Sequence, residues 1–315
     1  MAPKFTGHDT FPLRYGWMYK AVNSLIYKGN SEKGRDEQVH EAIVTLGVGR
    51  NMVNAIRYWA EMSGVLEAPL ESKTRGTLTV STLGHFIFSM DSAAGCVDPY
   101  LENIASVWLL HYRLNANNDH LTSYRYFFNY SNFQSFEKKK LIDEVMSSCI
   151  ALTGVEPGRE STIKRDVDCF LHTYIKKTQS QKTVNEDYFS SPLSELGLIT
   201  ESSSGYYVSE LTDRKSLSAE IFAYALCDFI KNETEDSGVN TIDFDSLLSK
   251  PGSPGRIFRL SEQGLSHKLD EASLLQDGLI SWVDSLGLRQ ILVADEVKKR
   301  PEFYLEMYYG NGHAY

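Results

Sequence analysis

This sequence lacks long hydrophobic runs. No stretch approaches the roughly 18 apolar residues that span a bilayer, and no basic segment followed by an apolar one opens the chain. We therefore expect a soluble, cytoplasmic protein. Its four cysteines form no Cys-x-x-Cys pair, which argues against a zinc knuckle or a redox motif and favours buried free thiols at Cys96, Cys149, Cys169 and Cys227.

The common nucleotide and hydrolase signatures are also missing. The sequence has no P-loop, no His-Glu-x-x-His and no Gly-x-Ser-x-Gly, and Met52 stands where a Gly-x-Gly-x-x-Gly begun at Gly47 needs its last glycine. ATP-driven chemistry by this chain alone is therefore not expected. Metal-assisted phosphodiester hydrolysis stays open, because it needs only two or three oxygen ligands and a group that orients water.

Positive charge is in deficit and unevenly placed. The 315 residues carry a formal charge of -9, which argues against a protein that coats nucleic acid without regard to sequence. Residues 1–76, however, hold ten Lys and Arg against eight Asp and Glu. A contact with a polyanion is therefore favoured in the N-terminal quarter.

That quarter contains the pattern of a helix-turn-helix. Residues 35–46 have an apolar face and end at Gly47, a short turn follows, and a second amphipathic helix runs to Gly64. Residues 65–88 then read as a hairpin with a polar tip that carries Lys73 and Arg75, as in the wing of a winged helix.

The second helix presents polar side chains suited to base edges. Arg50, Asn54, Arg57 and Glu61 are spaced by four, three and four residues, so they share the face opposite the core, and Asn51 and Tyr58 flank them. Arg and Asn match guanine and adenine edges in the major groove. We expect DNA contacts from Arg50, Asn51, Asn54, Arg57, Tyr58, Lys73 and Arg75; the alternative is a solvated polar face on an ordinary helix.

The opening run TGHDTFPLRYGWMYK is predicted to start a helix. Thr10 or Asp9 would cap it, Pro12 tolerates an early helical position, and apolar residues recur every four positions from Leu13. The helix start would leave His8, Asp9 and Arg14 able to meet an anion together. The alternative is a helix cap beside a packed Pro and Trp shoulder, without chemistry.

The middle of the chain, up to about residue 182, is helical and rich in Tyr and Phe. Asp98 and Glu102 could share a divalent ion, but first-turn acids at a helix start are the preferred interpretation. The aromatic residues around Arg125 could stack on bases, but packing between helices is preferred.

A second winged-helix-like unit follows, with a helix near Pro192, a strand, a Ser and Gly tip and a return strand, on an acidic surface that suits assembly. Further on, Arg256 and Arg259 in a Gly and Pro loop could hold a phosphate, although a turn that leads into a helix is the safer description. Asp284, Glu296 and Lys298 form a weaker alternative nuclease pattern, an acid followed by acid-x-Lys.

Five motifs in order resemble the SspB family: GHDTFPLRYGW, LGVGRNMVNAIRYW, DPYLENIASVWLLH, SPLSELGLI and PGSPGRIFRL. They extend over nearly the whole chain. The resemblance implies a component of a DNA phosphorothioation system for anti-phage defence, which nicks one DNA strand so that sulfur-transfer and ATPase partner proteins can act. It supplies no secure set of catalytic residues; at Asp9 a Glu is also familiar, a swap that keeps the carboxylate.

We thus expect a mainly α (α+β) protein with three parts: residues 1–95, an N-terminal helix and a winged-helix DNA-binding domain; 96–185, a helical domain; and 186–315, a second winged-helix-like and C-terminal domain. The leading hypothesis is a nickase for double-stranded DNA that uses Mg²⁺ or Mn²⁺, with His8, Asp9 and Arg14 near the scissile phosphate and Asp9 as the metal ligand. The competing hypotheses are a winged-helix regulator or specificity subunit without chemistry, and a scaffold for the partner enzymes. The sequence leaves the oligomeric state, the target bases and the metal open.

Overall fold

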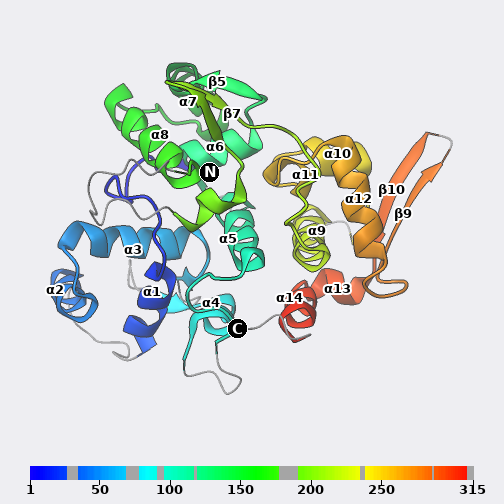
Figure 1. Ribbon diagram of the computed structural model, residues 1–315, viewed down its shortest axis with the longest axis horizontal. Coiled ribbons are helices and arrows are strands. Elements are labelled where there is room, and N and C mark those ends of the chain that lie inside the picture. The colour runs from blue at the N-terminus through cyan, green and yellow to red at the C-terminus, as the bar shows by residue number, and fades with distance from the viewer. Residues whose placement is uncertain are drawn as a thin grey trace.

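The computed structural model describes residues 1–26, 35–68, 78–90, 96–116, 119–176, 191–234, 238–285 and 287–310. The protein is mainly helical with four small sheets, as an α+β chain is expected to be. Its helices surround α5 (Ile104–Ala116), which lies near the centre of the view in Figure 1. Within the described residues no helix is both long and apolar enough to cross a membrane.

The N-terminal helices and the strand pair follow the predicted order, but residues 82–88, expected as part of the hairpin, form a helix that the Ser81 hydroxyl caps by accepting the Gly84 N–H. The elements of this region are α1 (Trp17–Ile26), α2 (Arg35–Leu46), α3 (Arg50–Met62), β2 (Leu66–Glu67), β3 (Thr79–Val80) and α4 (Thr82–Phe88). Gly47 has a φ of +63° between α2 and α3, a left-handed conformation that ends a helix at little cost in glycine. β2 and β3 pair antiparallel, and the tip between them, including Lys73 and Arg75, lies outside the described residues.

The opening run departs from its prediction. The first helix begins at Trp17, because Asp9 and Thr10 have φ values of 46° and 65° and so cannot belong to a right-handed helix. The backbone N–H of Phe11 donates to the His8 carbonyl and closes a turn instead. Before this turn, β1 (Ala2–Pro3) pairs in parallel with β4 (His120–Leu121).

The central region packs around aromatic side chains. Besides α5 it contains α6 (Ser123–Asn129), α7 (Lys138–Thr153) and α8 (Glu160–Tyr174). Phe127 and Phe128 are fully buried and Arg125 is buried beside them, which favours the packing interpretation of this aromatic run. The Asp98 carboxylate accepts backbone N–H groups of Glu102 and Asn103, so it caps the turn ahead of α5 rather than holding a metal.

The second predicted hairpin is present but belongs to a larger sheet. The short 3-10 helix η2 (Pro192–Leu196) precedes β6 (Thr200–Ser203) and β7 (Tyr206–Val208). A third strand, β5 (Ser135–Glu137), pairs with β7 from a distant part of the chain. A single-sequence pattern could not show that pairing.

The C-terminal region combines helices with a projecting hairpin (Figure 1). Its elements are α9 (Ala219–Thr234), β8 (Thr241–Asp243), α10 (Phe244–Ser249), α11 (Pro254–Ile257), α12 (Glu262–Ser273), β9 (Ile280–Ser285), β10 (Leu288–Val293), α13 (Asp295–Lys299) and α14 (Glu302–Tyr308). The sheet order is β8-β10-β9, with antiparallel pairs.

The Gly and Pro loop is a turn that leads into α11, as the safer description has it. The Arg256 guanidinium donates to the carbonyl oxygens of Asn129 and Ser131, and that of buried Arg259 donates to those of Phe133 and Ser209. Both cations therefore stabilise the fold, and the phosphate-binding alternative for this loop is wrong.

Buried side chains from all parts of the chain join one hydrophobic cluster, which includes Trp59 of α3, Trp108 of α5 and Phe222 of α9. The domain boundaries near residues 95 and 185 stay predictions, and both fall at or within segments outside the described residues. Cys149, Cys169 and Cys227 are buried and Cys96 is half-buried.

Candidate nucleic-acid interface

The opening run forms a loop between α3 and α8 (Figure 1). Toward α3, the Asn54 side-chain amide donates to the Asp9 carboxylate, with Nδ2 and Oδ2 3.2 Å apart. Toward α8, the His8 ring bonds to Asp166. The loop thus joins two of the predicted groups, the acid of the opening run and the polar stripe of α3.

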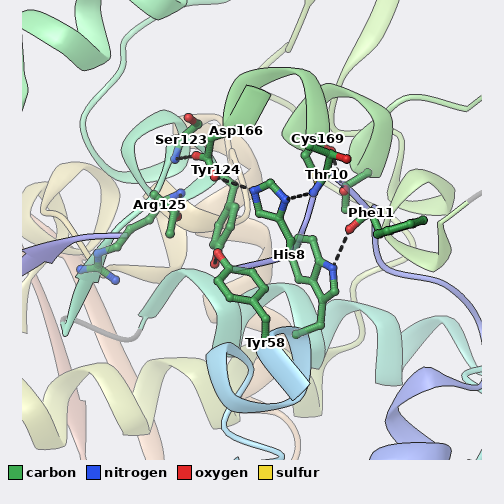
Figure 2. A network of polar contacts seen from close by, with 12 residues as sticks. His8, Thr10, Phe11, Tyr58, Ser123, Tyr124, Arg125, Asp166 and Cys169 are labelled. Carbon is green, nitrogen blue, oxygen red and sulfur yellow. Dashed lines mark hydrogen bonds and ion pairs between the residues drawn. The ribbon is translucent and has the colours of Figure 1, made fainter. Parts of the chain in front are cut away.

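His8 is only 2% exposed, and both of its ring nitrogens have partners (Figure 2). Nδ1 accepts the backbone N–H of Thr10 at 3.0 Å, so the ring proton belongs on Nε2, which lies 2.8 Å from Asp166 Oδ1. The other oxygen of Asp166 accepts the backbone N–H of Ser123 at 2.7 Å, at the start of α6.

His8 is therefore not positioned to bind a phosphate directly. We expected the start of a helix to leave His8 exposed beside Asp9; the tight turn instead directs the ring inward and Asp9 outward, to a half-buried position. Cys169 of α8 is buried, and that burial, aided by Asp166, raises the pKa of its thiol. This thiol stays protonated and is a poor nucleophile.

Tyr58 of α3 packs under the loop, between α3 and the core, and does not face solvent. It is 3% exposed, its hydroxyl lies 3.1 Å from that of Tyr124, and the His8 ring meets its ring edge-on at a centroid distance of 5.4 Å. Burial, with Tyr124 and Asp166 nearby, raises the pKa of Tyr58 well above its ordinary value. Tyr58 falls on the inward side of α3, so its burial does not favour the predicted DNA contact.

Gly7 explains how closely the loop approaches that ring. A Cβ at this residue would lie 2.6 Å from Tyr58 Cδ2, and its φ of +131° favours glycine. The Trp59 indole also donates to the Phe11 carbonyl at 3.0 Å. The loop is thus fixed to α3 through Tyr58, Trp59 and Asn54.

The remaining predicted contacts lie at or near the outer side of α3. Arg50 and Asn51 are exposed in its first turn, and Asn54 and Arg57 are half-buried further along. Arg14 lies in the loop with its guanidinium carbon 5.8 Å from the ring centroids of both Phe11 and Trp17, so its position is set by aromatic contact.

The alternative acid-x-Lys pattern does not form a site. Lys298 is buried, and its ammonium group donates to the Val239 carbonyl at 3.0 Å, whereas Glu296 is exposed on α13. Asp284 lies on β9 opposite Arg289. Residues two apart on a helix point to different sides, so α13 exposes Glu296 to solvent and buries Lys298.

Sequence reasoning missed Asp166, the residue that organises the loop. It lies at the edge of the apolar stripe of α8, which includes Ile163, Val167 and Phe170, and only 1% of it is exposed. Its charge beside an apolar stripe was the one available sign of its burial. The sequence could not show its partner, His8, because the two are 158 residues apart in the chain.

The chain belongs to the family described as "Protein of unknown function (DUF4007)", which it matches over residues 5–309. Two solved structures are similar to it, a magnesium-ion-bound crystal structure of SspB and a second SspB crystal structure. Each has 27% sequence identity and a TM-score of 0.79, and each match covers 97% of this chain and 87% of the SspB chain. No curated protein matches the chain. The resemblance to SspB predicted from the five motifs is confirmed.

The magnesium ion of that SspB structure raises the question of a metal in this chain. Within the described residues no three His, Cys, Asp or Glu side chains form a cage. Asp9 is the one predicted ligand, and a carboxylate that accepts one bond from Asn54 keeps further lone pairs. Mg²⁺ commonly binds one or two carboxylates and completes its shell with water and substrate phosphates. Asp9 fits that kind of shared site and not an all-protein one.

Proposed function

We propose that this protein is the DNA-binding component of a DNA phosphorothioation system and nicks one strand of double-stranded DNA with a divalent metal, Mg²⁺ or Mn²⁺. The similarity to SspB over nearly the whole chain supports the system. The observation that carries the proposal is the bond between Asp9 and Asn54, which joins the loop of the predicted site to the predicted recognition helix.

The elements α1 to α3 followed by the β2–β3 pair have the order of a winged helix, and α3 would enter the major groove. Its first turn offers exposed Arg50 and Asn51, and its N-cap, Gly49, has no side chain to bond the terminal N–H groups. Asn54 lies one turn further, about 6 Å along the helix axis. A phosphate near Arg50 would therefore be close to Asp9.

Each residue then has a separate role. Asp9 would hold the metal together with a phosphate oxygen, and a bound metal would neutralise charge that develops on the phosphate. Arg14, fixed on its two aromatic rings, would contact an adjacent phosphate. Arg50, Asn51, Asn54 and Arg57 would set the position and register of the duplex, and Lys73 and Arg75 remain proposed wing contacts.

The test is relaxation of supercoiled plasmid to open circles by the purified protein with Mg²⁺ or Mn²⁺. Asp9→Asn, which keeps the shape and suits a left-handed backbone, should lower the nicking rate about 100-fold or more because the anionic ligand is lost. Asp143→Asn, at an exposed acid of α7, is the matched control and should nick like the wild type. Equal rates in both variants would remove Asp9 from the site.

DNA affinity tests the other half of the proposal. Arg50→Ala should weaken binding to all sequences and reduce the slope of log affinity against log salt by about 1, since one phosphate contact is lost. Arg57→Ala tests the groove-facing stripe in the same titration. Lys139→Ala, an exposed cation of α7, controls for loss of charge alone. Unchanged affinity in both arginine variants would favour a scaffold for the sulfur-transfer and ATPase proteins.

One observation favours a second candidate, a DNA-binding regulator or specificity subunit without chemistry. Within the described opening run, Asp9 is the one accessible carboxylate. The nearby acid of α8, Asp166, is buried and bonded to His8. Protein that shifts DNA in a gel but never nicks it, with either metal, would support this candidate over the nickase.

A further inference from the structure

We propose that His8 is a positioning residue that fixes the backbone of Asp9 and Thr10 through its Nδ1, so that the Asp9 carboxylate faces α3, and that Asp166 only orients the imidazole ring that supplies this acceptor. The expected effect on nicking rests on the proposed function. The bond from the Thr10 N–H to His8 can be tested without measuring activity.

The backbone of Asp9 and Thr10 needs such a hold. Their φ values of 46° and 65° place two successive residues with side chains in the left-handed region, which costs free energy at each residue. Such conformations persist only where surrounding contacts determine them. Two bonds from this turn reach His8: the Phe11 N–H donates to the His8 carbonyl at 2.8 Å, and the Thr10 N–H donates to His8 Nδ1 at 3.0 Å. The second bond is the one that depends on the His8 side chain.

The His8 ring is itself held from two sides. Asp166 Oδ1 accepts the Nε2 proton, and the ring lies against Tyr58 and Trp59 of α3. Asp166 is in turn fixed by the Ser123 N–H at the start of α6. Buried groups of α8 and α6 thus orient the His8 ring, and the ring in turn holds the turn that carries Asp9. Figure 2 shows Ser123, Asp166, His8 and Thr10 in this series of bonds.

The two nitrogens of His8 can be tested separately by substitution. His8→Asn puts an oxygen where Nδ1 stands and keeps an acceptor for the Thr10 N–H, but it loses the donor to Asp166. His8→Gln can place an amide N–H near the position of Nε2, but it loses the acceptor for Thr10. A positioning role predicts that the variant with the acceptor for the Thr10 N–H, His8→Asn, retains nicking and that His8→Gln loses it.

The experiment compares plasmid nicking by the two variants with the thermal stability of each. His8→Asn should retain nicking within about tenfold, whereas His8→Gln should lose about 100-fold in kcat with KM for DNA within about twofold, as misplacement of a reacting group does. His85→Asn, at an exposed histidine of α4, is the control for the substitution itself. Loss in both variants in proportion to stability, or abolition in both, would overturn the positioning role.

Hydrogen exchange of the Thr10 amide, followed by NMR in protein labelled with ¹⁵N-threonine, gives the readout that does not need activity. The amide should be protected in wild type and in His8→Asn and exchange at least about tenfold faster in His8→Gln. If the wild type never nicks, the proposed function fails, and this pattern alone decides the inference. Equal protection in all three proteins would overturn it.

Discussion

Two buried histidines occupy different regions of this molecule and have different consequences. His8 in the opening loop is 2% exposed and His111 in α5 is 0% exposed, and each has partners on both ring nitrogens. The ring of His111 bonds to the Tyr174 hydroxyl and the Ile257 carbonyl, and aromatic rings surround it. His8 bonds to a carboxylate and to the turn that carries half-buried Asp9.

The difference shows that burial and bonding of a histidine do not by themselves define its role. His111 links core elements to one another, so its removal should affect stability alone. His8 links the core to a loop with an accessible acid, so its removal should also affect what that acid does. The following changes test this contrast, from the largest expected effect to the smallest.

Acidification should destabilise the His111 region most. Burial, assisted by Arg214 and opposed by the bond to Ile257, lowers the pKa of His111 from 6.5 to about 3. The unfolded chain binds this proton below about pH 6.5, whereas the folded protein does so only near pH 3. The free energy of unfolding should therefore fall through that window as pH falls, by on the order of 4 kcal/mol. Urea titrations between about pH 7 and about pH 4 measure it.

The matched variant is His111→Gln, which does not titrate in this range. It should be less stable than the wild type at neutral pH, because the two bonds of the ring are disturbed, but its stability should depend less on pH. A pH dependence as steep as that of the wild type would assign the acid sensitivity to other groups.

Loss of the Asp166 charge should have the next largest effect. In Asp166→Asn the side chain cannot accept both the His8 and the Ser123 protons, and a buried donor left without a partner costs about 2 to 3 kcal/mol. Denaturant unfolding measures the change. Asp143→Asn at an exposed site should stay within about 0.5 kcal/mol of the wild type; a similar loss in both would mean that the buried pair contributes nothing particular.

Gly7→Ala should loosen the loop at its contact with Tyr58. The added Cβ would meet the ring at 2.6 Å and the φ of +131° is unfavourable for alanine, so we expect a loss of about 2 kcal/mol. Gly278→Ala, with a φ of +78° and nothing within 4 Å of its Cβ, should lose only about 1 kcal/mol. Thermal unfolding of the two variants separates the cost of the clash with Tyr58 from the cost of a positive φ in alanine. Equal losses of stability in both would contradict a clash at Gly7.

Glu296→Gln should have the smallest effect. The residue is exposed on α13, and its predicted partner Lys298 is directed to the Val239 carbonyl, so stability should change by less than about 0.5 kcal/mol. Plasmid nicking should also be unchanged. A large loss of nicking here, with none in Asp9→Asn, would reverse the assignment of the site.

The local patterns predicted several elements well. The apolar spacing of residues 35–64 and the glycines at 47 and 64 predicted α2 and α3, because amphipathic periodicity and left-handed helix ends are properties of short segments. The start of α1 was placed too early, since Thr10 and Pro12 are equally compatible with a turn. The η2 segment was expected as a helix and is one short 3-10 turn.

The candidate site was predicted only in part. The sequence identified Asp9 and the polar face of α3 as separate candidates, and their contact was not foreseen. The inward direction of Tyr58 and His8 was missed for one reason: both are amphipathic side chains whose burial depends on partners, Tyr124 and Asp166, that come more than 60 residues later.

By itself the sequence determined the helical composition, the order of the N-terminal helices and hairpin and the family to which the chain belongs, because these depend on periodicity, turn residues and ordered motifs. Only the tertiary structure decided which polar residues are accessible. Asp166 and Arg259 are charged groups that the fold buries against distant backbone and side-chain partners. A buried polar group is stable only when such partners are in place, and those partners are fixed by packing between segments far apart in the chain.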